Sequence, residues 1–321
     1  MGRKSVFITR TIPDAGINAL ASAGLAVRVN PQARTLRPDE LLEEVGRHDG
    51  VICQLADKIN AAVLCAAAPR CKIFASCAVG YDNFDLKTAA RLGIVVTNTP
   101  DVLTNATADL AWALILATAR RLGEAERFVR AGAWRGWGML DFLGMDVHGR
   151  TLGVVGAGRI GTAVARRGTG FSMNLLYHDD GPRRQIEALG ATRVDLPELL
   201  AASDFVSLHV PLTEETRGLI DRRALYSMKR SAVLINTARG DVVDQPALIE
   251  ALREGRILAA GLDVYQNEPN VPKGLLELGN VVLLPHIGSA TVATRSRMAE
   301  IAAENVIAVL NGHPPLNPVV G

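Results

Sequence analysis

The sequence predicts an α/β protein that consists of two doubly wound, parallel-sheet domains with a cleft between them. Short apolar runs alternate with amphipathic helical segments from one end of the chain to the other. Strands that are separated by helices form parallel sheets with helices on both faces. The chain has 321 residues, and a domain typically has roughly 150. The length therefore favours two domains over one.

The first alternating series occupies the first hundred residues. Its helical segments include residues 38–48, PDELLEEVGRH, with acidic residues in the first turn and basic residues at the end. This charge order favours a helix, because acidic side chains stabilise the positive N-terminal end of the helix dipole and basic side chains stabilise its negative C-terminal end. The predicted strands of this series are SVFIT (5–9), LAVRV (25–29), GVICQ (50–54), KIFAS (72–76) and GIVVT (93–97).

A second alternating series follows a break in the pattern. Pro100 ends the preceding strand, and the helical pattern that follows, residues 101–132, is too long for a simple crossover. A glycine-rich segment then leads into the second series. Its predicted strands are TLGVVG (151–156), NLLYHD (174–179), DFVSLHV (204–210), SAVLINT (231–237), ILAAGLDV (257–264) and NVVLLPH (280–286).

The last segment of the chain predicts a long amphipathic helix that Gly312 and Pro314 end. We assign this helix, from about residue 291, to the first domain. The substrate-binding domain then comprises residues 1–99 plus 291–321, and the dinucleotide-binding domain comprises residues 100–290. The chain crosses twice between the two domains, and both crossings are hinge candidates.

The composition excludes several classes of protein. The net charge of +2 arises from 35 basic and 33 acidic residues, so nothing favours nucleic acid or an anionic membrane as a partner. The N-terminus lacks the apolar core of a signal peptide, and no apolar run reaches about 18 residues. The four cysteines lack CxxC spacing, which favours reduced thiols. We expect a cytoplasmic protein, and no residue cluster has the spacing of a metal site.

A glycine motif predicts where a dinucleotide binds. Gly156, Gly158 and Gly161 form GxGxxG directly after a predicted strand and at the start of a helix. Glycines there permit a tight turn, a close approach of pyrophosphate to the backbone, and close packing of the helix on the strand. Asp179 ends the next strand, where a carboxylate accepts hydrogen bonds from the adenosine ribose.

The residues near Asp179 also bear on the choice between NAD and NADP. The carboxylate of Asp179 repels a 2′-phosphate, and Asp180 adds a second negative charge. Both favour NAD. Arg183 and Arg184 follow closely enough to leave NADP open as an alternative.

Three polar residues follow predicted strands of the second series: Arg239, Glu268 and His286. The carboxyl ends of parallel strands meet at one edge of a sheet, where ligands bind. An arginine there can bind a carboxylate and polarise a carbonyl group. A histidine can protonate the alkoxide that a hydride transfer creates, and a neighbouring glutamate favours the protonated histidine.

Six motifs together resemble those of the D-isomer-specific 2-hydroxyacid dehydrogenase family. Within that family the chain most resembles the glyoxylate/hydroxypyruvate reductases and the 2-ketogluconate reductases. The resemblance covers almost the whole chain. Besides the glycine motif it is carried by SCAVGYDNFDL (76–86), NTPDVLTNATADLA (98–111), NTARGDVVDQPAL (236–248), GLDVYQNEP (261–269) and LLPHIGSAT (283–291).

The resemblance implies roles for individual residues. Arg239 binds and orients the substrate, His286 is the general acid/base, and Glu268 tunes His286. The backbone amides of Val79 and Gly80 bind the substrate carboxylate. The residues implied to bind the cofactor, besides the three glycines and Asp179, are Thr107, Arg159, Ile160, Val210, Pro211, Thr216, Thr237, Ala238, Asp263, His286 and Gly288, with Asp263 on the nicotinamide carboxamide.

The family also implies a reaction: NAD(P)H-dependent reduction of glyoxylate or hydroxypyruvate to the D-2-hydroxy acid. Alternatives are a reductase for 2-ketogluconate, pyruvate or phosphohydroxypyruvate, and a non-catalytic NAD(H)-sensing protein like the related corepressors. We expect a homodimer, because the family's region corresponding to Trp134 and Trp137 approaches the partner subunit. Trp112 lies on the apolar face of a helix and is expected to pack in the core or at a dimer contact.

Overall fold

The chain forms two compact units. The computed structural model describes residues 2–319. Unit 1 comprises Met1–Leu103 and Ser289–Gly321, and unit 2 comprises Thr104–Gly288. Unit 2 is thus one continuous segment, whereas unit 1 is assembled from both ends of the chain.

Unit 1 contains a five-stranded parallel sheet with the strand order β2-β1-β3-β4-β5. This is the order of flavodoxin-like sheets, in which the chain starts in the interior and reverses direction once. The strands are short and mostly buried. They are β1 (Ser5–Ile8), β2 (Ala26–Val29), β3 (Gly50–Cys53), β4 (Ile73–Ser76) and β5 (Val95–Thr97).

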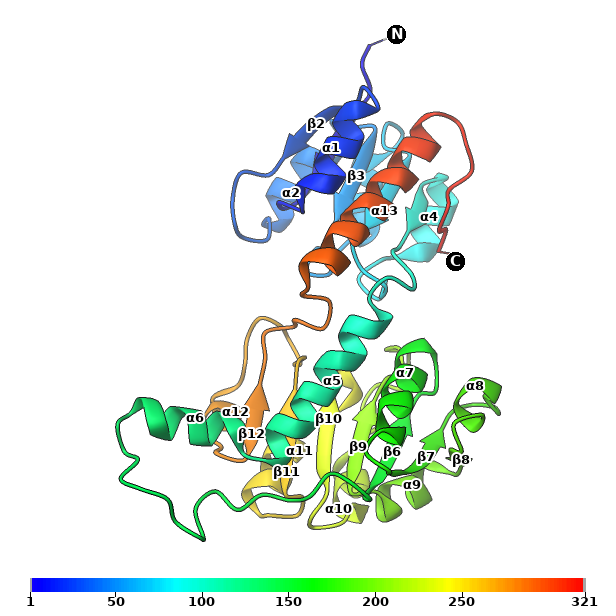
Figure 1. Ribbon diagram of the computed structural model, residues 1–321. Coiled ribbons are helices and arrows are strands. Elements are labelled where there is room, and N and C mark those ends of the chain that lie inside the picture. Colours follow the sequence, from blue (N-terminus) through cyan, green and yellow to red (C-terminus); the bar gives the residue numbers. More distant parts are fainter. Residues whose placement is uncertain (1, 320–321) are drawn as a thin grey trace. The chain divides into compact units, whose positions relative to one another are not determined.

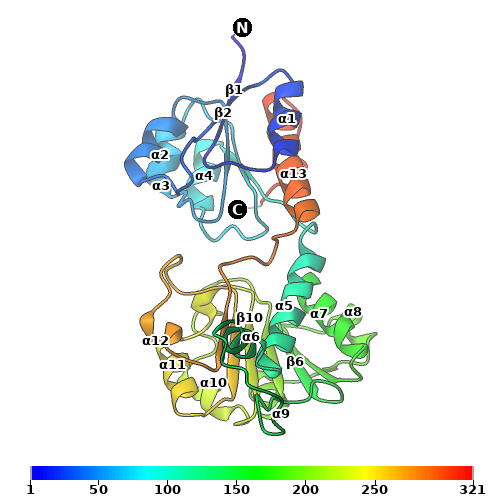
Figure 2. The same cartoon turned by 60° about the vertical axis from the view of Figure 1, so that its left-hand side comes forward.

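Helices cover both faces of this sheet. Two of them, from opposite ends of the sequence, lie side by side on one face (Figures 1 and 2). They approach so closely that a Cβ on Gly16 would lie 2.6 Å from the carbonyl oxygen of Ala299. These two adjacent helices are α1 (Asp14–Ser22) and α13 (Val292–Leu310). The helices that cover the other face are α2 (Pro38–Val45), α3 (Ala61–Ala67) and α4 (Leu86–Leu92).

The segment after α13 folds back beside β5. Asn305 of α13 is fully buried, and its Oδ1 accepts hydrogen bonds from the backbone N–H groups of Leu316 and Asn317, each at 2.9 Å. The backbone N–H of Val319 donates to the carbonyl oxygen of Val96 at 2.8 Å. Residues 315–319, which we call the tail, are therefore tied both to α13 and to the sheet.

Unit 2 contains a seven-stranded parallel sheet with the order β12-β11-β10-β9-β6-β7-β8. The order is that of the dinucleotide-binding Rossmann fold, extended by one strand. The strands are β6 (Thr151–Val155), β7 (Asn174–His178), β8 (Thr192–Arg193), β9 (Phe205–Leu208), β10 (Val233–Asn236), β11 (Ala259–Leu262) and β12 (Val281–Leu283).

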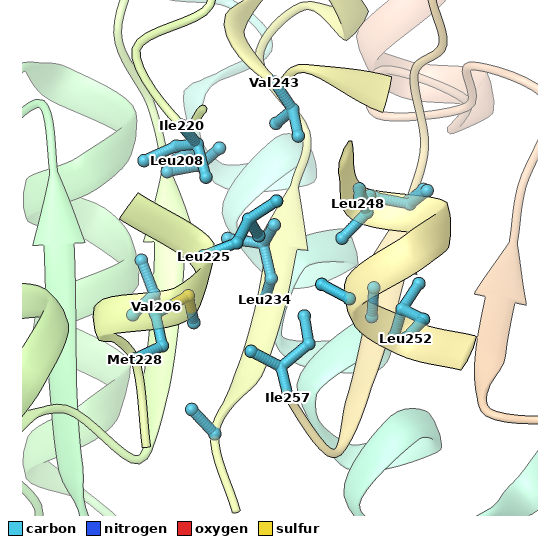
Figure 3. Packing of buried hydrophobic residues seen from close by; sticks show 14 of the residues in the cluster. Val206, Leu208, Ile220, Leu225, Met228, Leu234, Val243, Leu248, Leu252 and Ile257 are labelled. Atoms are coloured by element: carbon cyan, nitrogen blue, oxygen red, sulfur yellow. The ribbon is translucent and has the colours of Figure 1, made fainter. Parts of the chain in front are cut away.

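Consecutive residues of these strands enter two separate cores, because side chains alternate between the faces of a sheet. Leu234 lies in one core and its neighbour Ile235 in the other. Figure 3 shows the first core, where Val206 and Leu225 also lie. The helices of unit 2 are α5 (Thr104–Ala119), α6 (Leu122–Arg130), α7 (Arg159–Thr169), α8 (Arg184–Glu187), α9 (Leu196–Ala202), α10 (Arg222–Ser227), the 3₁₀ helix η1 (Gly240–Val242), α11 (Gln245–Arg253) and α12 (Lys273–Leu276).

The predicted α/β class with two parallel sheets is confirmed, with corrections to individual elements. The long helical pattern after Pro100 forms two helices, because Arg121 adopts a left-handed conformation with φ of 52° between α5 and α6. The two-residue strand β8 was not predicted, since both of its residues are exposed and carry no apolar signal. Among residues 2–319 no helix is both long and apolar enough to cross a membrane.

The segment between α5 and β6 extends away from the sheet of unit 2 (Figure 1). We call residues 120–144 the arm. Its ends are close together, since the backbone N–H of Met145 donates to the carbonyl oxygen of Ala119 at 2.9 Å. Trp134 and Trp137 of the arm are 58% and 79% exposed, so neither side chain is buried within the chain. Trp112, in contrast, is buried in the core, as its helical position predicts.

Candidate active site

His286 lies just beyond β12 in an unusual backbone conformation. Its φ of 54° is left-handed, a region that residues other than glycine rarely adopt. The predicted strand 280–286 therefore ends earlier, at Leu283. Backbone strain of this kind persists only where the surroundings enforce it, and it is frequent at functional sites.

Asp263, at the end of β11, supplies that enforcement. Its Oδ1 accepts a hydrogen bond from the N–H of Ile287 at 2.7 Å, and its Oδ2 accepts one from Gly288 at 2.8 Å. Its carbonyl oxygen accepts a third from the N–H of His286 at 2.9 Å. Burial raises the pKa of Asp263, and the two amides act against that rise. Three consecutive N–H groups are thus fixed by one residue.

Glu268 holds the imidazole of His286. The Nδ1 of His286 lies 2.8 Å from Oε2 of Glu268, and Oε1 accepts a hydrogen bond from the N–H of Tyr265 at 3.0 Å. Desolvation alone would raise the pKa of Glu268, but its hydrogen bond to His286 and the charge of that ring lower it below the ordinary value. The ionised carboxylate fixes the proton of His286 on Nδ1, so that Nε2 is the nitrogen left for a substrate.

Arg239 follows β10 and is positioned through its backbone. The side chain of Asn236 donates to the carbonyl oxygen of Arg239 at 2.9 Å and accepts from the N–H of Ala238 at 3.0 Å. The next residue, Gly240, packs so tightly that any Cβ would overlap the backbone of Tyr265. The loop that carries Arg239 therefore lies directly against the segment that carries Glu268.

These three residues come from neighbouring strands, because β10, β11 and β12 are adjacent in the sheet (Figure 1). The positive charge of Arg239 is itself one of the causes that lower the pKa of Glu268. The structure thus brings Arg239, Glu268 and His286 together at one edge of the unit 2 sheet. A cation, a carboxylate and an imidazole in this arrangement can polarise a carbonyl group and donate a proton to it.

The glycine motif has the geometry of a pyrophosphate site. Gly156 has a φ of 92°, and a Cβ there would lie 2.7 Å from the carbonyl carbon of His209. A Cβ on Gly161 would overlap the carbonyl oxygen of Gly156, so α7 packs closely on β6. Around Gly158, in contrast, no described atom lies within 4 Å of a Cβ. The backbone is therefore accessible at the N-terminus of α7, where Arg159 and Ile160 form the first turn.

Asp179 lies beside this loop and is already hydrogen-bonded. Its Oδ2 accepts from the N–H of Ala157 at 2.8 Å, and its Oδ1 accepts from Nε and Nη2 of Arg183 at 2.9 and 2.6 Å. Desolvation would raise the pKa of Asp179, but the hydrogen bonds from Arg183 and from the backbone, together with the charge of Arg183, lower it below the ordinary value. An ionised carboxylate at this position favours a ribose hydroxyl over a 2′-phosphate.

The other predicted cofactor residues differ in what their side chains contact. Thr237 has a buried hydroxyl with no hydrogen-bond partner among residues 2–319, which fits a position beside a ligand. The hydroxyl of Thr107 donates to the carbonyl oxygen of Gly288 at 3.3 Å. Thr216 donates to the carbonyl oxygen of Pro211 at 2.6 Å, so its hydroxyl is engaged within its own loop. Val210 and Pro211 follow β9, as the motif predicts.

Val79 and Gly80 lie in the loop after β4 of unit 1. Within the described part of the chain, neither backbone N–H donates a hydrogen bond. Unpartnered amides in a loop are available to an anion, which agrees with the role implied for these two residues.

Sequence reasoning missed the residues that position the candidate site. The roles of Asn236 and Gly240 in placing Arg239 were not predicted, and Asp263 was assigned only to the nicotinamide. The left-handed backbone of His286 carries no sequence signal of its own. A glycine directly after Arg239 was the one available indication of a close backbone approach.

Comparison with known proteins identifies the family. Residues 112–288 match the NAD-binding domain of the D-isomer specific 2-hydroxyacid dehydrogenases. The chain is also 51% identical over 318 residues to a glyoxylate reductase of Thermococcus onnurineus. The aligned residues cover 98% of this chain and 95% of the relative. The chain belongs to the D-isomer specific 2-hydroxyacid dehydrogenase family. The predicted family is therefore confirmed, and unit 2 of this dehydrogenase contains the family's NAD-binding domain.

Solved structures agree with this assignment. The dehydrogenase is similar to the TT0316 protein from Thermus thermophilus, with a TM-score of 0.93 and 48% identity over 98% of this chain and 100% of that chain. It is also similar to an NADPH-dependent glyoxylate/hydroxypyruvate reductase from Sinorhizobium meliloti solved with NADP and malonate. That match has a TM-score of 0.87 and 37% identity, and it covers 99% of this chain and 97% of that chain.

Proposed function

We propose that this dehydrogenase reduces glyoxylate and hydroxypyruvate to the corresponding 2-hydroxy acids, with the D configuration where the product is chiral. The observation that carries the proposal is the pair of His286 and Glu268, 2.8 Å apart, beside Arg239 at the edge of the unit 2 sheet. The names of similar proteins, several of them glyoxylate reductases at about half identity, support the choice of substrate.

Several residues of the chain have separate roles in the proposed reaction. The reduced nicotinamide, when bound, supplies the hydride that adds to the carbonyl carbon. Arg239 binds the 2-oxo acid and polarises its carbonyl group. His286 donates the proton of Nε2 to the carbonyl oxygen, and Glu268 stabilises the charged imidazole before that transfer. We assign the substrate carboxylate to the open amides of Val79 and Gly80.

We propose NADH as the preferred cofactor, with NADPH as a weaker alternative. Gly156, Gly158 and Gly161 would hold the pyrophosphate, and Asp179 the adenosine ribose. Because Arg183 already pairs with Asp179, its charge is partly neutralised and attracts a 2′-phosphate less. The ratio of kcat/KM for NADH to that for NADPH tests this: a ratio below one would contradict it. Replacement Asp179→Ser should lower the ratio, since it removes the repulsion and frees Arg183.

The proton-transfer role is tested by His286→Ala. This change should lower kcat for NADH oxidation with glyoxylate by about 10²- to 10⁴-fold, the usual contribution of a general acid. Binding of NADH, followed by its fluorescence, should persist in the variant. The matched control is His148→Ala, which alters an exposed histidine before β6. Equal turnover in His286→Ala and the parent would refute the assignment.

Other 2-oxo acids provide the sharpest test of substrate. Glyoxylate, hydroxypyruvate, pyruvate, phosphohydroxypyruvate and 2-ketogluconate should be compared by kcat/KM with NADH. A preference of more than about tenfold for one of the last three, about 1.4 kcal/mol in transition-state binding, would replace the proposed substrate.

We also propose that the dehydrogenase is a homodimer and that the arm lies in its interface. The arm exposes Trp137 (79%) and Leu140 (78%) together with Met139 (73%). Large contiguous apolar surfaces are rare on monomers, and aromatic residues are enriched at interfaces. Light scattering should give twice the chain mass of 34.2 kDa. The double replacement Trp137→Ser and Leu140→Ser should shift the mass to that of one chain, and a monomeric parent would overturn the proposal.

A further inference from the structure

Two carbonyl groups of the loop that contains Val79 and Gly80 accept hydrogen bonds from residues that follow β5. The carbonyl oxygen of Ala78 accepts a hydrogen bond from the backbone N–H of Thr99 at 2.8 Å. The carbonyl oxygen of Val79 accepts one from Nδ2 of Asn98 at 2.8 Å. Two consecutive peptide groups of the loop are thus fixed by two consecutive residues that follow β5.

Because the peptide bond is planar, these two contacts also fix the directions of the neighbouring N–H groups. The carbonyl of Ala78 and the N–H of Val79 belong to one peptide group, and in a trans peptide they point in opposite directions. The same holds for the carbonyl of Val79 and the N–H of Gly80. By accepting hydrogen bonds on the carbonyl side, the loop directs both N–H groups away from Asn98 and Thr99. Neither N–H has an acceptor within residues 2–319.

Asn98 is in turn fixed by the tail. Its backbone N–H donates to the carbonyl oxygen of Asn317 at 3.2 Å. Asn317 is held by Asn305, whose Nδ2 donates to Oδ1 of Asn317 at 3.0 Å and whose own side chain is fully buried in α13. A continuous set of hydrogen bonds therefore runs from α13 through the tail to Asn98 and ends at the carbonyl of Val79.

We propose that Asn98 is a positioning residue for the substrate carboxylate. It holds the peptide group between Val79 and Gly80 in the orientation that presents the N–H of Gly80 to the anion, while the backbone of Thr99 does the same for the N–H of Val79. This inference rests on the proposed function, in which these two amides receive the carboxylate. Preorganised amides bind an anion more strongly than amides that must first rotate into place.

The test is the kinetics of two variants, Asn98→Ala and the smaller change Asn98→Ser. Neither variant has a side-chain amide that can donate a hydrogen bond to the carbonyl oxygen of Val79. Both should raise KM for glyoxylate about tenfold, as expected for one hydrogen bond to a charged group. Turnover at saturation should change by less than about threefold, because the proton donor and Arg239 are intact. The inhibition constant of oxamate, a 2-oxo acid analogue with the same carboxylate, should rise in parallel with KM.

Two controls separate a positioning role from a general loss of structure. NADH binding and the melting temperature report on folding and should stay close to those of the parent. The matched control is Asn280→Ala, which also removes side-chain hydrogen bonds to backbone carbonyls, those of Leu252 and Leu258 at 3.2 and 3.0 Å, but at the start of β12. Asn280→Ala should leave KM for glyoxylate and the inhibition by oxamate unchanged.

The outcomes are distinguishable. An unchanged KM in both Asn98 variants, with an active parent, would overturn the inference and leave the proposed function intact. A fall in kcat with constant KM would also overturn it. A parent that does not oxidise NADH with any 2-oxo acid would instead refute the proposed function. If Asn98→Ala does not fold, the KM of Asn98→Ser for glyoxylate alone tests the inference.

Discussion

Gly240 is the residue on which the relative positions of Arg239 and Glu268 depend. A Cβ at position 240 would overlap the backbone of Tyr265, so even alanine requires the two loops to separate. We expect Gly240→Ala to lower kcat/KM at least about tenfold, since small displacements of positioned groups are costly in catalysis. Gly279→Ala is the matched control, because no described atom lies within 4 Å of its Cβ. Full activity of Gly240→Ala would show that Arg239 does not require this close packing.

The carboxylate of Glu268 should make stability depend on pH. Its pKa is lowered in the folded chain, so its stabilising contribution is present above the ordinary value of 4.5 and is lost as the pH falls through the lowered value. The Glu268 side chain is 34% exposed, and solvent screening keeps the contribution to about 1 kcal/mol or less.

The measurement is urea unfolding of the parent and of Glu268→Gln from about pH 7 to about pH 3. The parent should be the more stable of the two at neutral pH, and the difference in unfolding free energy should vanish in acid. A difference that is independent of pH would rule out a charge effect at Glu268.

The sequence predicts the reacting side chains better than the residues that orient them. Arg239, Glu268 and His286 are recognisable because each has a distinctive chemistry and follows a strand. The hydrogen bond from Asn98 to Val79 is accepted by a backbone carbonyl group, which is the same in every residue and leaves no sequence signal.

At the level of elements, the end of β11 determines the conformation of the segment after β12. Asp263→Asn keeps the shape of the side chain but replaces one acceptor oxygen with an NH₂ group, which then faces the N–H of Ile287 or Gly288. A buried donor without an acceptor costs about 1–3 kcal/mol. We expect the unfolding free energy to fall by that amount in urea titrations.

A surface replacement is the control for this prediction. Asp241→Asn alters an aspartate whose ion pair with Arg217 lies at the surface, where each side chain is more than a third exposed. It should change the unfolding free energy by less than about 0.5 kcal/mol. If Asp263→Asn is no less stable than this control, the carboxylate does not hold the segment in place.

The predicted elements are correct in type but not in extent. Each predicted strand contains an observed one, yet 257–264 shortens to Ala259–Leu262 because only those residues pair with neighbouring strands. Apolar residues beyond the ladder continue the pattern without continuing the strand. The end of α5 is a similar case, because the left-handed residue Arg121 is no glycine and gives no indication of a helix end.

At the level of the whole molecule, unit 2 contains complete cores of its own. Both apolar clusters that cover its sheet are made only of residues between Ala108 and Leu284. We therefore expect a fragment of residues 104–288 to fold alone and to bind NADH, seen as enhanced NADH fluorescence. The fragment should not reduce glyoxylate, because it lacks Val79 and Gly80. An unfolded fragment, judged by circular dichroism, would show that unit 2 requires unit 1.

The construction of unit 1 from both ends of the chain also dictates an order of events during synthesis on the ribosome. Strands β1 to β5 emerge first, but α13, which covers Ile8, Ile52 and Ile73, is translated last. Of the two helices on that face only α1 is available early, so the part that α13 covers stays exposed while the whole of unit 2 is made. The part of the protein that begins first is thus the part that finishes last, and nascent chains stalled shortly before α13 should expose an apolar surface for chaperones to bind.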